Sequence, residues 1–597
     1  MSHPTSSPDV YLRRPHIESA PSSSASLQSL SKQEKYRIGS RTVPQSLVNT
    51  EHVKAHLGLL AAFKELRQRV ETCPDDYLPD IAQFLDGSQR WAWFHRWVKY
   101  VKRTELATWV TEEAPPLDVL MMWHAYMLNP TWYAEDCDRI AVLGTLRLLN
   151  SYFMPAVILM GDLTLYEPCE ERTLTWFEQT DTPFDPLASM SCLLHRATRC
   201  PGCGRLNDVP FLNEDGSGYL QRSFRYMCIC GLSITKTALA MDKFADDLVA
   251  NHRSNPRQPS VYLAGTLHTR TNPRDWSRAG EIKNRLAFHD SLRAVSKMLR
   301  TEWKHSIKEK FGYSISNLPQ MLVLSRTMNA YTDDRPFSVD LVAAVLRQGT
   351  FIDAMDSLGW LTPGYFDDNQ NAVLLTHALA RYHAFLDLLS SASSPFFVPT
   401  LDIDIVWHTH QLKGDEYTKE SKEFVGWYVD HDDRVEEIYL ANGLDETCHA
   451  WQERFGMPYM HCGCPLPDEK MSSKLHQITR RLGSSKIRTR ATHASEHDAV
   501  RARRNHPAYF TDPHEARALE LRRRRERDGR RVLEGKMDEE LYRRGQMHIS
   551  TYLMPLPGAQ VGPGPSEQWA APCVVTFPGA FGTTGVGACI AGVNHYV

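Results

Sequence analysis

The most regular hydrophobic pattern in the chain lies between residues 398 and 412. One stripe recurs at intervals of three and four residues, the spacing of a helix face, and consists of Leu401, Ile405, His408 and Leu412. A second stripe on the other side consists of Ile403, Trp407 and His410. A helix that is apolar on two sides is normally buried, so this segment predicts a helix through a domain core. Its buried histidines need hydrogen-bond partners, and Asp404, four residues before His408, could supply one.

The same pattern occurs earlier in the chain, between residues 116 and 128. When Asp118 is aligned with Asp402, four further identities follow without a gap: Trp123 with Trp407, His124 with His408, Leu128 with Leu412 and Tyr133 with Tyr417. Each copy follows an apolar helical run and a short loop that contains Pro. We therefore predict an internal repeat, a helix–loop–helix unit present once in each of two related helical halves.

The remaining periodicity predicts a mainly α fold, with two related multi-helix halves, a small β zinc-ribbon-like insert and disordered termini. Ser338 is the expected N-cap of one strongly apolar helix in the second half. Seven regions follow from composition and pattern: a disordered N-terminal region at 1–45, helical half one at 46–195, the insert at 196–234, a helix and linker at 235–260, helical half two at 261–465, a basic helical region at 466–550 and a Gly/Pro-rich tail at 551–597.

Four of the 13 cysteines have the spacing of a metal site. Cys200-Pro-Gly-Cys203 is typical of a zinc knuckle, in which two thiolates flank a tight turn. The second pair, Cys228 and Cys230, departs from the usual spacing because only one residue separates its thiols. We predict a structural Zn²⁺ held by these four cysteines, with His195 as a substitute ligand if one thiol points away. A redox dithiol and unrelated cysteines remain the alternatives.

A second candidate site combines histidine and carboxylate. His408 or His410 with His431, Asp432 and Asp433 could bind zinc, iron or manganese. Because consecutive helical residues are rotated by about 100°, His408 and His410 lie roughly 200° apart and cannot both face one ion. The alternative is that these histidines are hydrogen-bonded core residues. Another set could hold a second zinc or form only an exposed turn: Cys448, His449, His461, Cys462 and Cys464.

Charge and composition limit the classes of function. The formal net charge is −3, so no global field attracts nucleic acid or membrane. Residues 480–531 nevertheless hold sixteen Lys and Arg against seven acidic residues, and the part from Arg501 to Arg531 could bind phosphates of a nucleic acid or be a solvated charged helix. No signal peptide is recognisable, and no uninterrupted run approaches the roughly 18 apolar residues of a membrane helix. We expect a cytoplasmic protein, with a nuclear location open, no membrane association and reduced thiols.

The segment Pro399-Thr-Leu-Asp-Ile-Asp-Ile-Val-Trp-His-Thr-His-Gln-Leu412 resembles the signature of the glycine-rich domain-containing protein-like family, a former domain of unknown function of fungi and plants. Further similar segments extend the resemblance over residues 45–465, and the Gly-rich stretch at 578–587 resembles a reduced form of the fungal glycine-rich terminus. The resemblance implies no particular reaction. The sequence also contains no nucleophile elbow, phosphate-binding loop or dinucleotide fingerprint.

The sequence therefore favours an intracellular interaction or scaffold protein with an unidentified protein partner, and leaves open whether it is an enzyme. The first alternative is a metal-dependent hydrolase or oxidoreductase that uses His408, His410, His431 and Asp432. The second alternative is association with nucleic acid through the basic C-terminal segment.

Overall fold

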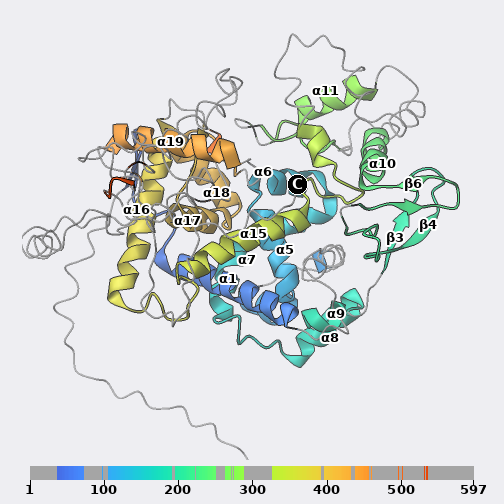
Figure 1. Ribbon diagram of the computed structural model, residues 1–597, viewed down its shortest axis with the longest axis horizontal. Helices are drawn as coiled ribbons and strands as arrows, with labels where there is room; N and C mark the ends of the chain where they lie inside the picture. The colour runs from blue at the N-terminus through green and yellow to red at the C-terminus, as the bar shows by residue number, and fades with distance from the viewer. Residues whose placement is uncertain are drawn as a thin grey trace, which may run out of the picture.

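Helices make up most of the described chain in the computed structural model (Figure 1), which confirms the prediction of a mainly α fold. The strands form only short antiparallel pairs. The structure describes the following residues: 36–72, 97–98, 105–190, 195–221, 223–250, 262–269, 272, 274–287, 326–391, 396–431, 437–455, 459, 495, 500–501, 530 and 533–535.

The strands β1 (Tyr36–Ile38) and β2 (Arg41–Val43) pair before the long helix α1 (Thr50–Glu71), with which the first predicted half begins. Both strands lie within residues 1–45, where the sequence predicted disorder. Asn49 caps α1, because its side chain accepts a hydrogen bond from the backbone N–H of His52. The later helical elements are α4 (Leu106–Thr108), η1 (Trp109–Glu113), α5 (Leu117–Met127), α6 (Pro130–Arg139), η2 (Ala141–Leu143), α7 (Gly144–Met160), α8 (Glu170–Thr180) and α9 (Pro186–Met190).

Two small hairpins separate these helices from the second predicted half. The first pairs β3 (His195–Arg199) with β4 (Leu206–Pro210), and the second pairs β5 (Tyr226–Met227) with β6 (Ser233–Ile234). The later elements are α10 (Lys236–Val249), α11 (Trp276–Ala287), α15 (Leu341–Ser357), α16 (Asn369–Ser390), β7 (Phe396–Phe397), α17 (Leu401–Gln411), α18 (Asp415–Glu420), η3 (Ser421–Val425), α19 (Glu437–Phe455) and β8 (Val500–Arg501), which pairs with β7.

Helix α15 begins later than the sequence suggested. Its N-cap is Asp340, whose side chain accepts from the N–H of Ala343, and not Ser338. Ser338 instead donates both its N–H and its hydroxyl to the carboxylate of Asp136 on α6. The expected N-cap was wrong because a tertiary partner occupies the serine.

The two predicted halves share one hydrophobic core. A single cluster of buried side chains runs from Ile38 to Tyr459 and includes both Trp123 and Trp407. Helix α1 lies at its centre and contacts α5 and α7 of the first half as well as α15, α16 and α17 of the second. The halves are therefore interleaved, and the helix that joins them comes from the beginning of the described chain.

One apolar segment is longer than the sequence analysis recognised. Ala141–Met160, which comprises η2 and α7, is long and apolar enough to cross a membrane by length and composition alone. Polar residues such as Arg147 interrupt this segment, so it contains no uninterrupted apolar run. In the fold Leu149 and Phe153 are buried, α7 packs against α1 and α6, and Arg147 pairs with Asp415. A core helix has these same features.

Candidate functional site

The two copies of the repeated pattern, residues 116–128 and 398–412, are called the first and the second signature. They adopt equivalent local structures on α5 and α17. The indole N–H of Trp123 donates to the hydroxyl of Tyr133 at 3.0 Å, and that of Trp407 donates to the hydroxyl of Tyr417 at the same distance. The helix ends also agree, since Leu128 donates its N–H to the carbonyl of His124, and Leu412 donates to that of His408, both at 3.1 Å. These aligned residues therefore make the same contacts in both segments.

Each signature histidine meets a second histidine in the core. The Nε2 atoms of His124 and His56 are 2.8 Å apart, and those of His408 and His431 are 2.9 Å apart. All four rings are buried. His56 also places its Nδ1 atom 2.9 Å from the hydroxyl of Thr409, so the first pair contacts α17 directly. Burial lowers the pKa of His56 well below its usual value, and the nearby His408 adds to this effect.

A carboxylate joins the second pair but has no counterpart in the first. Asp404 Oδ1 lies 3.2 Å from His408 Nε2, and its other oxygen accepts a hydrogen bond from the Ser495 hydroxyl at 2.6 Å. Donor atoms of Asp404, His408 and His431 all lie within 4.8 Å of one another. The position of Leu120 on α5 corresponds to that of Asp404 on α17. The contact between Asp404 and His408 that the sequence suggested is present, at 3.2 Å.

His410 points to the other side of α17, as the helical rotation requires. Its Nδ1 atom lies 2.7 Å from the Tyr382 hydroxyl, and its Nε2 atom lies 2.6 Å from the Glu420 carboxylate. Burial lowers the pKa of His410, and although burial acts in the opposite direction on Glu420, the contacts with His410 and Lys413 lower its pKa too. A neutral imidazole that donates from Nε2 and accepts at Nδ1 fits this arrangement. The structure thus separates His410 from His408 and His431.

Several other candidates from the sequence fall outside the described residues: Asp432, Asp433, His461, Cys462 and Cys464. Arg501 ends β8, whereas residues 502–529 and Arg531 of the basic segment are not among those the structure describes. Cys448 is buried on α19, while the adjacent His449 is exposed.

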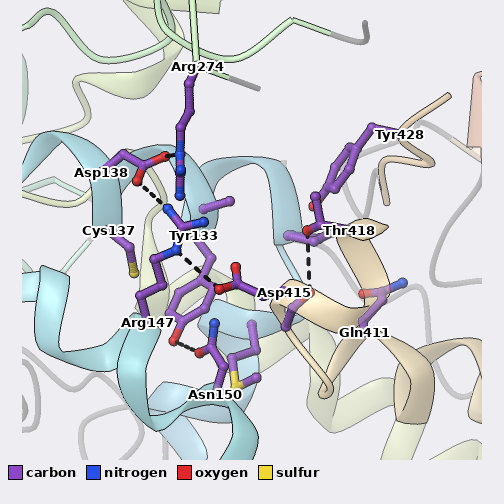
Figure 2. A pocket seen from close by; sticks show the side chains of 14 residues that line it. Tyr133, Cys137, Asp138, Arg147, Asn150, Arg274, Gln411, Asp415, Thr418 and Tyr428 are labelled. Carbon is purple, nitrogen blue, oxygen red and sulfur yellow. Dashed lines mark hydrogen bonds and ion pairs between the residues drawn. The ribbon is translucent and has the colours of Figure 1, made fainter. Parts of the chain in front are cut away.

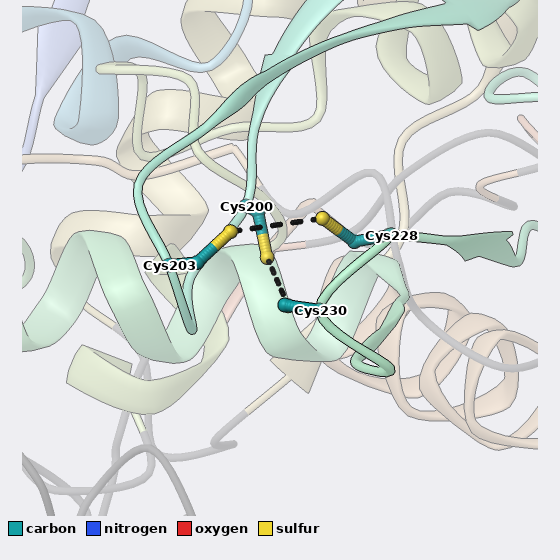
Figure 3. A group of neighbouring side chains, drawn as sticks. All are labelled: Cys200, Cys203, Cys228 and Cys230. Carbon is teal, nitrogen blue, oxygen red and sulfur yellow. Dashed lines mark hydrogen bonds between the residues drawn. The ribbon is translucent and has the colours of Figure 1, made fainter.

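The four cysteines of the insert converge at the ends of the two hairpins (Figure 3). The sulfurs of Cys200 and Cys230 are 3.6 Å apart, and those of Cys203 and Cys228 are 3.7 Å apart. These separations are too long for disulfide bonds, which join sulfurs at about 2.05 Å. A tetrahedral Zn²⁺ with Zn–S bonds of about 2.3 Å places its sulfurs about 3.8 Å apart. The geometry of the thiols therefore fits this ion.

The unusual spacing of the second pair is resolved by a tight turn. Gly231, at φ +86°, donates its N–H to the carbonyl of Cys228, and this turn brings Cys230 back toward Cys228. Met227 and Ile229 are exposed at 61% and 77%. Hydrogen bonding from the Cys230 N–H and the neighbouring thiols lowers the pKa of Cys228 to about 7, whereas burial raises that of Cys200 to about 12. His195 begins β3 and is not part of the cluster.

The insert also has a small hydrophobic core of its own. Tyr219 is fully buried and forms edge contacts with Phe211 and Phe224. The cations of Arg196 and Lys236 lie 4.2 Å and 3.4 Å from the centre of the Tyr219 ring. Cys200 and Cys228 belong to the same hydrophobic cluster, so the thiols are attached to a packed unit.

Comparison with known proteins places the second signature, residues 398–412, within a sequence region shared with a known family. Residues 277–420 match the sequence model of the glycine-rich domain-containing protein-like family. The chain is 36% identical to glycine-rich domain-containing protein 2 of Arabidopsis thaliana over 132 residues, which are 21% of this chain and 16% of that relative. It is 30% identical to glycine-rich domain-containing protein 1 of the same plant over 152 residues, or 22% of this chain and 19% of the relative. Residues 277–420 therefore carry a domain of the glycine-rich domain-containing protein-like family.

The family match covers α15, α16, α17 and α18 and includes Asp404, His408, His410 and Glu420. It is narrower than the resemblance over residues 45–465, and the matched segment covers less than a fifth of each relative. His56, His431, Ser495 and the cysteine cluster lie outside residues 277–420. No solved structure matches the chain.

A cavity of about 160 Å³ lies between α6, α7 and α18 (Figure 2). Arg147 spans it and pairs with Asp138 and with Asp415, the latter at 3.1 Å. Arg274 pairs with Asp138 at 2.9 Å. The positive charges of Arg147 and Arg274 are therefore balanced by the negative charges of Asp138 and Asp415. The histidine pairs do not line this cavity.

His408 and His431 could be predicted as candidates from the sequence, whereas the roles of His56 and Ser495 could not. Two signals in the sequence bear on His56: it lies within the region that resembles the family, and its helix is strongly periodic. Neither signal identifies its partner, because His56 and His124 are separated by 68 residues. Ser495 is 91 residues from Asp404. Contacts at such separations depend on the tertiary fold.

Proposed function

We propose that this chain is an interaction or scaffold protein whose insert is a structural zinc ribbon. The observation that carries the proposal is the convergence of four thiols, with sulfur separations of 3.6 Å and 3.7 Å that suit one tetrahedral ion. Cys200, Cys203, Cys228 and Cys230 are the ligands. The ion supplies free energy that joins two hairpins of only two to five residues per strand.

The position of the thiols favours a structural ion over a redox dithiol. Each knuckle contributes one sulfur to each close pair, so the close pairs join different hairpins. A redox motif instead keeps its reactive pair within one short segment. The backbone supports this view, since each knuckle is closed by a glycine N–H: Gly204 donates to the carbonyl of Cys200, four residues back, and Gly231 to that of Cys228, three residues back, both at 2.9 Å.

Exposed apolar side chains next to the thiols support an interaction role. Leu206, Met227 and Ile229 are exposed at 66%, 61% and 77%, and they lie on the strand and turn that flank the knuckles. Leu232, exposed at 36%, packs beside Gly202 of the first knuckle. Apolar groups gathered on one exposed module are typical of a contact surface. We propose that an apolar surface of a protein partner binds there and that zinc holds the surface in shape.

The surroundings of the histidines favour this reading over the enzyme alternative. A hydrolase or oxidoreductase needs an open cavity in which a substrate can reach its catalytic groups. His408 is fully buried, His431 is 4% exposed, and His410 is engaged by Tyr382 and Glu420. A cytoplasmic or nuclear location, where thiols stay reduced, suits the proposed zinc ribbon.

The zinc part of the proposal can be tested by element analysis of the purified full chain. Cys203→Ser should lose one equivalent of zinc, whereas Cys169→Ser, which alters an exposed cysteine outside the cluster, should lose none. A chelator should weaken hydrogen-exchange protection in β3–β6 and leave α17 protected. Unchanged zinc content in Cys203→Ser would contradict the proposal.

The interaction part can be tested by cross-linking followed by identification of the linked residues. In wild-type protein, cross-links to a protein partner should fall on residues 199–206 and 226–233. The double variant Met227→Ser/Ile229→Ser should lose these cross-links and keep its zinc. Leu165→Ser, which removes a side chain that is 78% exposed outside the insert, should keep them. Equal loss or equal retention in the two variants argues against the ribbon surface.

A further inference from the structure

The second signature contains a metal-ligand set separate from the thiols. We propose that Asp404, His408 and His431 bind one divalent first-row transition-metal ion in the helical core. The ion would fasten the segment that follows η3 to α17. This inference does not rest on the proposed zinc ribbon, because the two groups share no residue and differ in ligand chemistry.

The separations of the donor atoms support this assignment. The Nε2 atoms of His408 and His431 are 2.9 Å apart, and His408 Nε2 is 3.2 Å from Asp404 Oδ1. Metal–ligand bonds of about 2.1 Å put neighbouring donors about 3.0 Å apart in an octahedral site and about 3.4 Å apart in a tetrahedral one. The separation of 3.2 Å lies between these values and that of 2.9 Å just below the lower one, so small movements would admit an ion.

The chemistry of the contacts points in the same direction. His408 Nε2 faces a nitrogen of His431 and an oxygen of Asp404, and a single proton on Nε2 can be donated well to only one of them. A divalent ion is a common partner for all three donor atoms. It would also offset the cost of placing a carboxylate in a position with no exposed surface.

The surroundings hold these side chains in place. The second oxygen of Asp404 accepts from the Ser495 hydroxyl, and the N–H of Ser495 is bound to the carbonyl of Pro399 at 2.9 Å. The ring of Phe351 packs 4.6 Å from that of His408, and the ring of Trp407 packs 5.1 Å from that of His431. A hydrogen-bonded ligand oxygen and packed ligand rings are the support that metal sites require.

The first signature provides an internal control. His56 and His124 have the same Nε2–Nε2 approach, at 2.8 Å, but Leu120 replaces the carboxylate at the equivalent position. His56 Nδ1 is also engaged by Thr409. A close pair of histidines is thus compatible with a simple N–H···N hydrogen bond. Asp404 is the feature that turns the second pair into a ligand set.

Two imidazoles and one carboxylate suit zinc, iron(II) or manganese(II), whereas four thiolates favour zinc. Because the three ligands are buried, the ion is expected to stabilise the fold and to exchange slowly. The site therefore differs from that of the ribbon in its ligands, in the expected rate of metal exchange and in its location in the fold.

The experiment uses the full chain with Cys203→Ser, so that ribbon zinc does not mask the second ion. Element analysis should find one remaining equivalent of metal. X-ray absorption at that metal's edge should show nitrogen and oxygen neighbours and no sulfur. Adding Asp404→Asn or His431→Gln should reduce the remaining metal at least tenfold. The matched change His124→Gln in the first pair should leave it in place.

Cobalt(II) provides a measurement on a chain in which Asp404, His408 and His431 are all unchanged. Added to the metal-free Cys203→Ser chain, it should give ligand-field absorption without thiolate charge-transfer bands, at one equivalent. The proposal is overturned if no cobalt binds, if the spectrum is that of thiolate ligands, or if folded Asp404→Asn and His431→Gln chains retain the ion. Loss of the ion in His124→Gln with unchanged circular dichroism would also overturn the assignment to the second pair.

Discussion

Replacement of Asp136 by alanine should cause one of the largest losses of stability in this protein, because this carboxylate connects the two predicted halves. It has no exposed surface. Tyr126 donates to it from α5, and Arg139 donates from α6 at 2.8 Å. Ser338, just before α15, donates both its backbone N–H and its hydroxyl, at 2.7 Å and 2.6 Å. One side chain thus satisfies groups from three segments.

The expected magnitude follows from what the substitution leaves behind. Removing one partner of a buried ion pair costs about 3–5 kcal/mol. Arg139 keeps Asp247 at 3.7 Å as a second counter-ion, which reduces this part of the loss. The unpaired donors of Tyr126 and Ser338 add to it, at about 1–3 kcal/mol for a buried group that loses its partner. We therefore expect Asp136→Ala to lower the free energy of unfolding by about 4 kcal/mol.

The assay is urea unfolding of the full chain, followed by circular dichroism at a helical wavelength. Ser338→Ala removes only the hydroxyl bond and should cost about 1.5–3 kcal/mol. Asp367→Ala, which removes a 78% exposed partner of Lys54, should cost less than about 1 kcal/mol. If Asp136→Ala unfolds at the same urea concentration as Asp367→Ala, the connection between the halves does not contribute as we argue.

Three further predictions test individual parts of the fold. Tyr417→Phe and Tyr133→Phe each remove the acceptor of a buried indole N–H, so each should lower the free energy of unfolding by about 1–3 kcal/mol, by similar amounts, in urea titrations. Burial lowers the pKa of His383 to about 4, and its Nε2 atom accepts a hydrogen bond from the N–H of Leu47, so the folded state binds a proton at His383 less well than the unfolded state does. The free energy of unfolding should therefore fall as the pH drops from about 6.5 to 4, and His383→Gln should reduce this dependence on pH. Gly414→Ala should lower the melting temperature, because φ is +59° and a Cβ would lie 2.6 Å from the side chain of Asn150, whereas Gly58→Ala on α1 has open space and should not.

Features fixed by local geometry could be predicted from the sequence. The two stripes of α17 indicated a helix buried on all sides, and all eleven of its residues are buried. The rotation between residues two apart placed His408 and His410 on opposite sides, where the structure has them. The grouping of the cysteines likewise followed from a spacing of two residues in the first knuckle. Such patterns depend only on helix or turn geometry.

Features that depend on the tertiary fold could not be predicted in this way. Periodicity showed that α1 was amphipathic, but not that it lies between the two signatures. The assignment of Ser338 as an N-cap failed because Asp136, 202 residues away, competes for the same hydroxyl. His410 was a candidate metal ligand, but in the structure its two ring nitrogens are hydrogen-bonded to Tyr382 and Glu420. No sequence spacing reveals that these residues lie close to it.

The position of α1 also explains why two similar signatures can have different chemistry. In the first, the partner of His124 is His56, which comes from α1 and is tied by Nδ1 to Thr409 of α17. That pair therefore bridges the two signatures and lies within the shared core. In the second, the partner of His408 is His431, which follows η3 and is not part of the bridge. A carboxylate on α17 can thus join the second pair without disturbing the contact between the halves. A carboxylate in place of Leu120, which is 3% exposed, would instead add a charge to the core beside His56 and His124, the pair that bridges the two signatures.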